Sequence, residues 1–156
     1  CKFGDGTELN HFNLRFTTRK LMALATRASI FHVDCTYKVI KYFFPLLVFG
    51  CTDIDRKFTP IAFMITSHET TADFVHFFSQ FNRIYDELND QEFAPKYIIS
   101  DASNATIKAL NRIYPLCKTV MCFFHVMMNV RKHKNLLNCK EDYKTMQKCI
   151  YILHNA

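Results

Sequence analysis

The hydrophobic pattern of the chain predicts strands in its first half. Apolar, β-rich runs occupy roughly Ser29 to Tyr37, Phe43 to Thr52 and Phe58 to Thr66. The polar stretch at residues 53–57 separates the last two runs, which is typical of an antiparallel hairpin. Residues 1–16 show only weak extended or turn character.

Helical periodicity dominates the second half. Apolar residues recur at three- and four-residue steps from Thr70 or Thr71 to Leu88, which predicts an amphipathic helix. The other predicted elements are a helix from Thr17 or Thr18 to Ala28, a strand at 97–99, a helix from Ser103 or Asn104 to Ile113, a strand at 118–124, a basic helix at 125–137 and a final helix at 141–153.

This order of elements predicts an α/β fold. A hairpin-linked antiparallel half is followed by strands that alternate with helices, which favours a mixed five-stranded sheet with helices on both faces. The strands at 29–37, 97–99 and 118–124 are expected to lie parallel. In open sheets of this kind, ligands gather at the carboxyl ends of the parallel strands.

Composition is consistent with one domain. The chain has 156 residues, 49% of them hydrophobic, and 16 are Phe. This is long enough to bury a substantial core. The longest apolar run, from Tyr42 to Cys51, is shorter than the roughly 20 residues that a membrane helix needs, so we expect no membrane span. Because the chain opens on Cys1 without a Met, we expect residues 1–156 to be a fragment of a longer protein.

Seven cysteines form an odd set without a tight framework. Several lie inside apolar runs, so reduced thiols of a cytosolic or nuclear protein explain them better than disulfides. Given a DNA partner, the nucleus is the expected location.

The formal net charge of +6 is unevenly distributed. Residues 69–95 carry one basic and six acidic side chains, whereas residues 96–156 carry ten basic and three acidic ones. A basic C-terminal third suggests nucleic acid as a partner, and a solvated basic helix face explains the charge equally well. Within it, Arg131, Lys132 and Lys134 are candidate phosphate contacts.

Two aspartates are the candidate metal ligands. Asp34 interrupts an apolar strand, where a charge is costly, and Asp101 directly follows another. Neighbouring strands lie about 4.8 Å apart, so the two carboxylates could share a cation. Oxygen ligands suit Mg²⁺ or Mn²⁺, and paired metals serve in-line displacement at phosphodiesters. The alternative is a pair of structural acids that cap turns or helices.

Cys122 and His125 form a third candidate feature at the end of the last predicted strand. If that strand lies beside the strand at 97–99, His125 falls near the two acids and could contact a phosphate or order the site. A buried Cys with a helix-capping His is the structural alternative. A zinc site is disfavoured because its ligand spacing, C-x4-C-x2-H-x7-H-x5-C, matches no common pattern; it would use Cys117, Cys122, His125, His133 and Cys139.

Taken together, these motifs resemble the catalytic core of Mutator-like element (MULE) transposases over residues 12–137. The segments that carry the resemblance are Phe31–Lys38, the hairpin with Asp53, Pro60–Thr70, Ile98–Asp101 and Cys122–Val126. The resemblance implies a ribonuclease H-like fold, a two-metal Mg²⁺ or Mn²⁺ site, and DNA strand cleavage and transfer at transposon ends. It also implies a homo-oligomer in the full-length protein.

By position, Asp34 and Asp101 are similar to the first two acids of the DDE triad, and Cys122 and His125 to the family's C-x2-H signature. His125 would assist catalysis. In the family the third acid follows a helical insertion beyond that signature, and this chain ends 31 residues after His125. We therefore expect an incomplete enzyme. Glu141, 40 residues after Asp101, is interpreted as an acid at a helix N-terminus. The alternative function is a domesticated, inactive DNA-associated regulator or interaction module.

Overall fold

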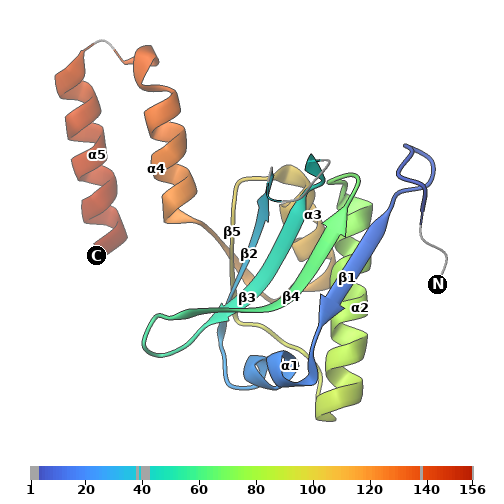
Figure 1. The fold of residues 1–156 in the computed structure, drawn as a ribbon. Helices are drawn as coiled ribbons and strands as arrows, with labels where there is room; N and C mark the ends of the chain where they lie inside the picture. The colour runs from blue at the N-terminus through green and yellow to red at the C-terminus, as the bar shows by residue number, and fades with distance from the viewer. Residues whose placement is uncertain (1–3, 38, 40–42, 138, 156) are drawn as a thin grey trace. The chain divides into compact units, whose positions relative to one another are not determined.

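The computed structural model describes residues 4–37, 39, 43–137 and 139–155. The chain divides into two compact units, Cys1–Val120 and Met121–Ala156. Among the described residues, the first unit contains a sheet and three α-helices, and the second contains two α-helices joined through a short 3-10 helix (Figure 1). Lys38 and residues 40–42, part of the predicted motif and hairpin segments, lie outside the described residues.

The first unit is built on a six-stranded sheet with the strand order β1-β4-β3-β2-β5-β6. This corrects the prediction of five strands, because β1 is paired along the sheet edge with β4. Its sequence, NLRFT, has only two apolar residues, too weak a pattern for a strand signal. The strands are β1 (Asn13–Thr17), β2 (Ile30–Thr36), β3 (Leu46–Thr52), β4 (Phe58–Thr66), β5 (Tyr97–Ser100) and β6 (Lys118–Met121).

The pairing of the central strands agrees with the predicted mixed sheet. β3 and β4 form the antiparallel hairpin, β2 pairs antiparallel with β3, and β2 pairs parallel with β5. The parallel register places Val33 opposite Ser100. β6 is the neighbour of β5, and the Lys118 backbone N–H donates to the Lys96 carbonyl at 3.0 Å.

Three helices follow the predicted caps. Thr18 caps α1 (Arg19–Ala25), Thr70 caps α2 (Thr71–Asn89), and Ser103 caps α3 (Asn104–Ile113). α1 ends at Ala25, earlier than predicted, because the backbone N–H groups of Arg27 and Ala28 bond to the carbonyls three residues back, those of Leu24 and Ala25, and no longer four residues back.

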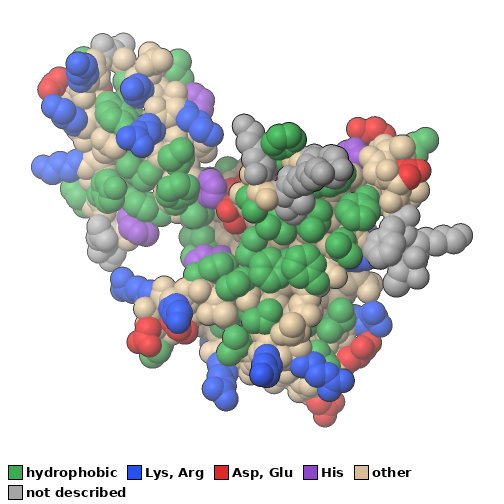
Figure 2. Space-filling model, in the orientation of Figure 1, with side chains coloured by type: hydrophobic (Ala, Val, Ile, Leu, Met, Phe, Trp, Pro, Cys, Tyr) green, Lys and Arg blue, Asp and Glu red, His purple; other side chains and the backbone are tan. Residues whose placement is uncertain are grey.

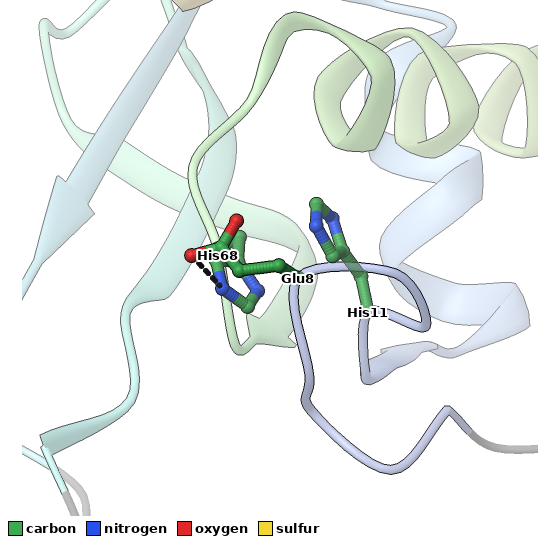
Figure 3. Close-up of side chains that lie close together, drawn as sticks. All are labelled: Glu8, His11 and His68. Carbon is green, nitrogen blue, oxygen red and sulfur yellow. Dashed lines mark ion pairs between the residues drawn. The ribbon is translucent and has the colours of Figure 1, made fainter.

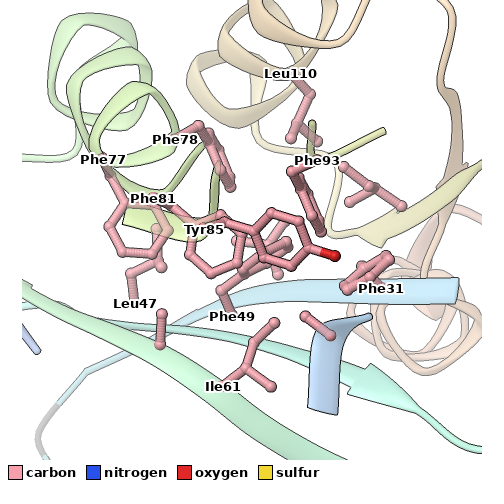
Figure 4. Close-up of a cluster of buried hydrophobic side chains, with 14 of the residues drawn as sticks. Phe31, Leu47, Phe49, Ile61, Phe77, Phe78, Phe81, Tyr85, Phe93 and Leu110 are labelled. Carbon is pink, nitrogen blue, oxygen red and sulfur yellow. The ribbon is translucent and has the colours of Figure 1, made fainter. Parts of the chain in front are cut away.

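Aromatic side chains form the core of this unit (Figure 4). Phe49, which is fully buried on β3, packs edge-to-face against Phe81 at 5.1 Å and Phe78 at 5.5 Å. Burying each such side chain contributes roughly 1.5 to 3 kcal/mol. Met22 of α1 and Leu110 of α3 belong to the same core. The prediction of helices on both faces is therefore not met within this unit, since α1, α2 and α3 all pack into one core.

The opposite face of the sheet exposes apolar side chains. In Figure 1 this face of the sheet is turned toward the viewer, with α2 and α3 behind the strands. Figure 2, in the same orientation, shows hydrophobic side chains gathered over the strands. The strand register aligns Phe16 with Phe63 and Phe63 with Val48, and the rings of Phe16 and Phe63 stack at 5.1 Å. Phe16 is 46% exposed. We call this surface the open face.

The second unit contains α4 (Phe123–Lys132), a 3-10 helix (Lys134–Leu136) and α5 (Lys140–Asn155). Phe123 stacks on His154 at 3.8 Å and contacts Tyr151 edge-on at 5.3 Å, which joins the two helices. β6 ends at Met121, so the predicted strand to Phe124 is too long and the helix begins before His125. No described helix is long and apolar enough to cross a membrane.

Candidate active site

Asp34 and Asp101 lie at matching positions on two neighbouring parallel strands. Val33 of β2 is paired with Ser100 of β5, and each aspartate is the next residue along its chain. Adjacent strands are about 4.8 Å apart, so the two backbones carry these acids at the same level of one sheet edge. The Asp101 carboxylate accepts a hydrogen bond from the Ser103 backbone N–H at 3.2 Å.

Asp34 is exposed, contrary to the expectation of a buried acid. It alternates along β2 with Phe31 and Val33, whose side chains enter the core. Asp34 therefore belongs to the open face, where its cross-strand partner is Val48. An apolar run predicted burial on both faces of the strand, but only one face is covered by the helices of this unit.

A third carboxylate, that of Glu69, follows a strand that ends at the same end of the sheet. β2, β3 and β4 are successively antiparallel, so β2 and β4 run in the same direction and end at the same edge. Glu69 follows β4 and precedes Thr70, the N-cap of α2. The Tyr37 hydroxyl donates to its Oε2, whereas its Oε1 is buried and has no hydrogen-bond partner among the described residues.

Cys35 and Tyr37 lie within electrostatic range of these acids. Burial raises the pKa of the Cys35 thiol far above its ordinary value, and the charges of Glu69, Asp101 and Asp34 raise it further. Burial, the hydrogen bond to Glu69 and its charge likewise raise the pKa of Tyr37. Cys35 and Tyr37 are therefore neutral at pH 7. The carboxylates make the electrostatic potential around them negative, which favours a bound cation.

The donor set fits a hard divalent cation. Asp34, Asp101 and Glu69 offer carboxylate oxygens, which Mg²⁺ and Mn²⁺ prefer. Burying a carboxylate oxygen without a hydrogen bond is costly, and a cation beside Glu69 Oε1 would remove that cost. Asp34 and Asp101 are therefore the candidate ligands of the predicted ion, whereas the three carboxylates do not form a group whose ligand atoms all lie within 4.8 Å of one another among the described residues.

Sequence reasoning assigned no role to Glu69. A signal was present: an acid lies near the end of, or after, each of three strands that point the same way, namely Asp34 within β2, Glu69 three residues after β4 and Asp101 directly after β5. Glu69 is placed at the same end of the sheet as Asp34 and Asp101 only once the hairpin is known to bring β4 back parallel to β2. The strand directions, not the local motif, identify the third residue.

Cys122 and His125 belong to the second unit. Cys122 is the N-cap residue of α4 and makes no side-chain capping bond, and His125 lies in the first turn. The N-cap residue is thus Cys122 and not His125, which the alternative interpretation of the sequence had as the helix cap. Both side chains are half-buried, and the His125 ring contacts Phe124 edge-on at 5.5 Å. A role for His125 beside the two acids stays a prediction.

The predicted phosphate contacts are all exposed. Arg131 and Lys132 lie in the last turn of α4, and Lys134 lies in the 3-10 helix that follows. Cations at a helix C-terminus are favourable against the helix dipole. Glu141 lies in the first turn of α5, as predicted, and its carboxylate is 3.5 Å from the Lys144 ammonium. Of the zinc alternative's residues, Cys117 belongs to the first unit and the other four to the second.

A comparison with models of protein families identifies the family to which this chain belongs. The model of the MULE transposase domain matches residues 30–129, which is more than half of the chain. The chain belongs to the MULE transposase domain family. The resemblance carried by the motifs is thereby confirmed. No curated protein matches the chain.

The matched part of the MULE domain contains Asp34, Glu69, Asp101, Cys122 and His125. It crosses the boundary between the two units after Val120. The basic residues from Arg131 onward follow directly after it. A transposase domain implies an interaction with DNA, and the exposed basic residues offer the charge that DNA phosphates require.

Proposed function

We propose that this MULE domain is the core of a DDE-type transposase, which cleaves and transfers DNA strands at transposon ends with Mg²⁺ or Mn²⁺. In this proposal the domain has a ribonuclease H-like fold, and the full-length protein acts in the nucleus as a homo-oligomer. The observation that carries the proposal is the register that places Asp34 and Asp101 at the same level of two neighbouring parallel strands. The family match supports the reaction class.

In this proposal Asp34 and Asp101 are the metal ligands, and Glu69 supplies an additional oxygen. Glu69 precedes Asp101 in the chain, so it is not the third acid of the family's order. A bound divalent cation would activate a water or a 3′-hydroxyl and stabilise charge at the phosphate. Tyr37 holds one oxygen of Glu69 by its hydroxyl, which leaves the other oxygen available.

The remaining roles belong to the second unit. His125 assists the reaction by contacting a phosphate or a water, and Cys122 and His125 together form the C-x2-H signature. Arg131, Lys132 and Lys134 hold the DNA backbone, since each is an exposed cation on one helical segment.

Mn²⁺ titration followed by electron paramagnetic resonance tests the metal assignment. The 156-residue chain should bind Mn²⁺ weakly, and Asp34→Asn or Asp101→Asn should weaken binding at least tenfold because each removes a negatively charged ligand. Glu69→Gln should weaken it severalfold. Asp55→Asn is the matched control, because Asp55 is exposed in the turn between β3 and β4, at the opposite end of the strands from Asp34. Unchanged binding in Asp34→Asn rejects the proposal.

A further inference from the structure

Glu8, His11 and His68 form a second cluster of metal-ligating side chains (Figure 3). Glu8 and His11 come from the N-terminal segment before β1, and His68 comes from the loop between β4 and α2. The two imidazole rings stack with centroids 4.1 Å apart and planes inclined by 19°. Glu8 Oε1 is 3.3 Å from His68 Nε2, and one ligand atom of each residue lies within 4.8 Å of the others.

Both imidazoles are held through their Nδ1 atoms. His11 Nδ1 is 3.0 Å from both oxygens of Asp73, so it donates a proton to that carboxylate and leaves Nε2 as the ligand atom. Ser67 Oγ lies 2.8 Å from His68 Nδ1 and can accept from it in the same way. A carboxylate behind the second ring nitrogen, as Asp73 lies behind His11, is a usual support of a metal-binding histidine.

Asp73 is itself fixed, which makes this support rigid. It is 5% exposed and accepts hydrogen bonds from the Thr70 hydroxyl at 2.6 Å and the Asn13 amide at 3.1 Å. Residues of β1 and of the first turn of α2 thereby hold the carboxylate that orients His11. The position of His11 is set by the fold of the first unit.

We propose that Glu8, His11 and His68 bind one Zn²⁺ ion through His11 Nε2, His68 Nε2 and a Glu8 oxygen. Two imidazoles and one carboxylate are an established ligand set for zinc, with water in the fourth position. Ligand atoms about 2.1 Å from a tetrahedral zinc lie about 3.4 Å apart. Glu8 Oε1 and His68 Nε2, 3.3 Å apart, already match this spacing, and the Glu8 side chain, which is 86% exposed, is free to adjust toward His11.

This site is chemically distinct from the carboxylate edge. Imidazole ligands select zinc and its neighbours among the transition metals, whereas carboxylates alone suit Mg²⁺ and Mn²⁺. The bound ion would join the N-terminal segment to the loop whose next residue is Glu69. It would thus restrict the movement of the loop that carries Glu69.

Co²⁺ as a spectroscopic substitute for Zn²⁺ tests the site on the 156-residue chain. We expect a visible d–d absorption that one equivalent of Zn²⁺ abolishes, without a thiolate charge-transfer band. His68→Ala and His11→Ala should each weaken binding at least tenfold, and Asp73→Asn should weaken it about tenfold through the lost support of His11. Glu8→Gln should weaken binding severalfold. Because Glu8 is exposed, this variant tests the site even where a histidine variant fails to fold.

Two controls separate this site from other ligands. His76→Ala removes an exposed histidine of α2 and should leave the Co²⁺ affinity unchanged. Asp34→Asn should also leave it unchanged, so that failure here is distinct from failure of the transposase proposal. A thiolate band would assign the metal to cysteines, and unchanged affinity in both His68→Ala and Glu8→Gln would equally overturn the proposal.

Discussion

At the scale of single residues, Asp73 shows how a buried charge is stabilised. Burial alone would raise its pKa, but hydrogen bonds from Thr70, Asn13 and His11 outweigh burial and hold the pKa below its usual 3.8. The hydrogen bond to Asp73, with its charge, raises the pKa of His11 above 6.5. Each partner therefore favours the charged form of the other.

Replacing Asp73 by Asn should lower the pKa of His11 toward 6.5, as measured by NMR titration of the imidazole ring. His11 is protonated in the folded state above the pH at which it loses its proton when unfolded. Its contribution to stability is therefore complete below pH 6.5 and is lost as the pH rises through the raised pKa. The contribution of Asp73 is present above pH 3.8 and is lost as the pH falls through its lowered pKa. An unchanged His11 titration in Asp73→Asn would show that the pair does not form.

At the scale of elements, local signals predicted most of the first unit. The stripe of Phe side chains and the Thr70 cap specified α2, and the polar turn specified the β3–β4 hairpin. Two features lacked a local signal. β1 is a strand because β4 offers it an edge, and Asp34 is exposed because helices of this unit cover one face of β2. Both depend on pairing and packing between distant segments.

Removing the cap of α2 should destabilise the first unit measurably. The Thr70 side chain accepts from the Asp73 backbone N–H, and the Asp73 carboxylate accepts from the Thr70 backbone N–H, which is a capping box. Thr70→Ala should lower the free energy of unfolding by about 1 kcal/mol in urea titrations. Ser79→Ala, at an exposed position in the middle of the same helix, is the control and should leave stability equal or slightly higher. Equal losses in both variants would contradict the capping role.

At the scale of the whole molecule, the candidate functions divide between the two units. The acids occupy one sheet edge of the first unit, whereas residues 121–156 carry six Lys or Arg against two acids. Figure 2 shows Lys and Arg side chains over the helical hairpin. The charge distribution predicted a basic C-terminal third from residue 96, and the second unit lies within it. The sequence could not assign the role of Glu69, because that role depends on the strand directions of the sheet.

DNA binding should depend on the basic residues of the second unit and on salt. If Arg131, Lys132 and Lys134 each contact one phosphate, replacing all three by Ala should reduce the slope of log K against log salt concentration by about 2.7. Fluorescence anisotropy with a labelled duplex, measured at several salt concentrations, gives this slope. A matched triple replacement of Arg19, Lys20 and Arg27, which are exposed in and beside α1, should leave it unchanged. Equal reductions in the two triple variants would mean that the chain binds DNA by its total charge, and the second unit would then lose its assigned role.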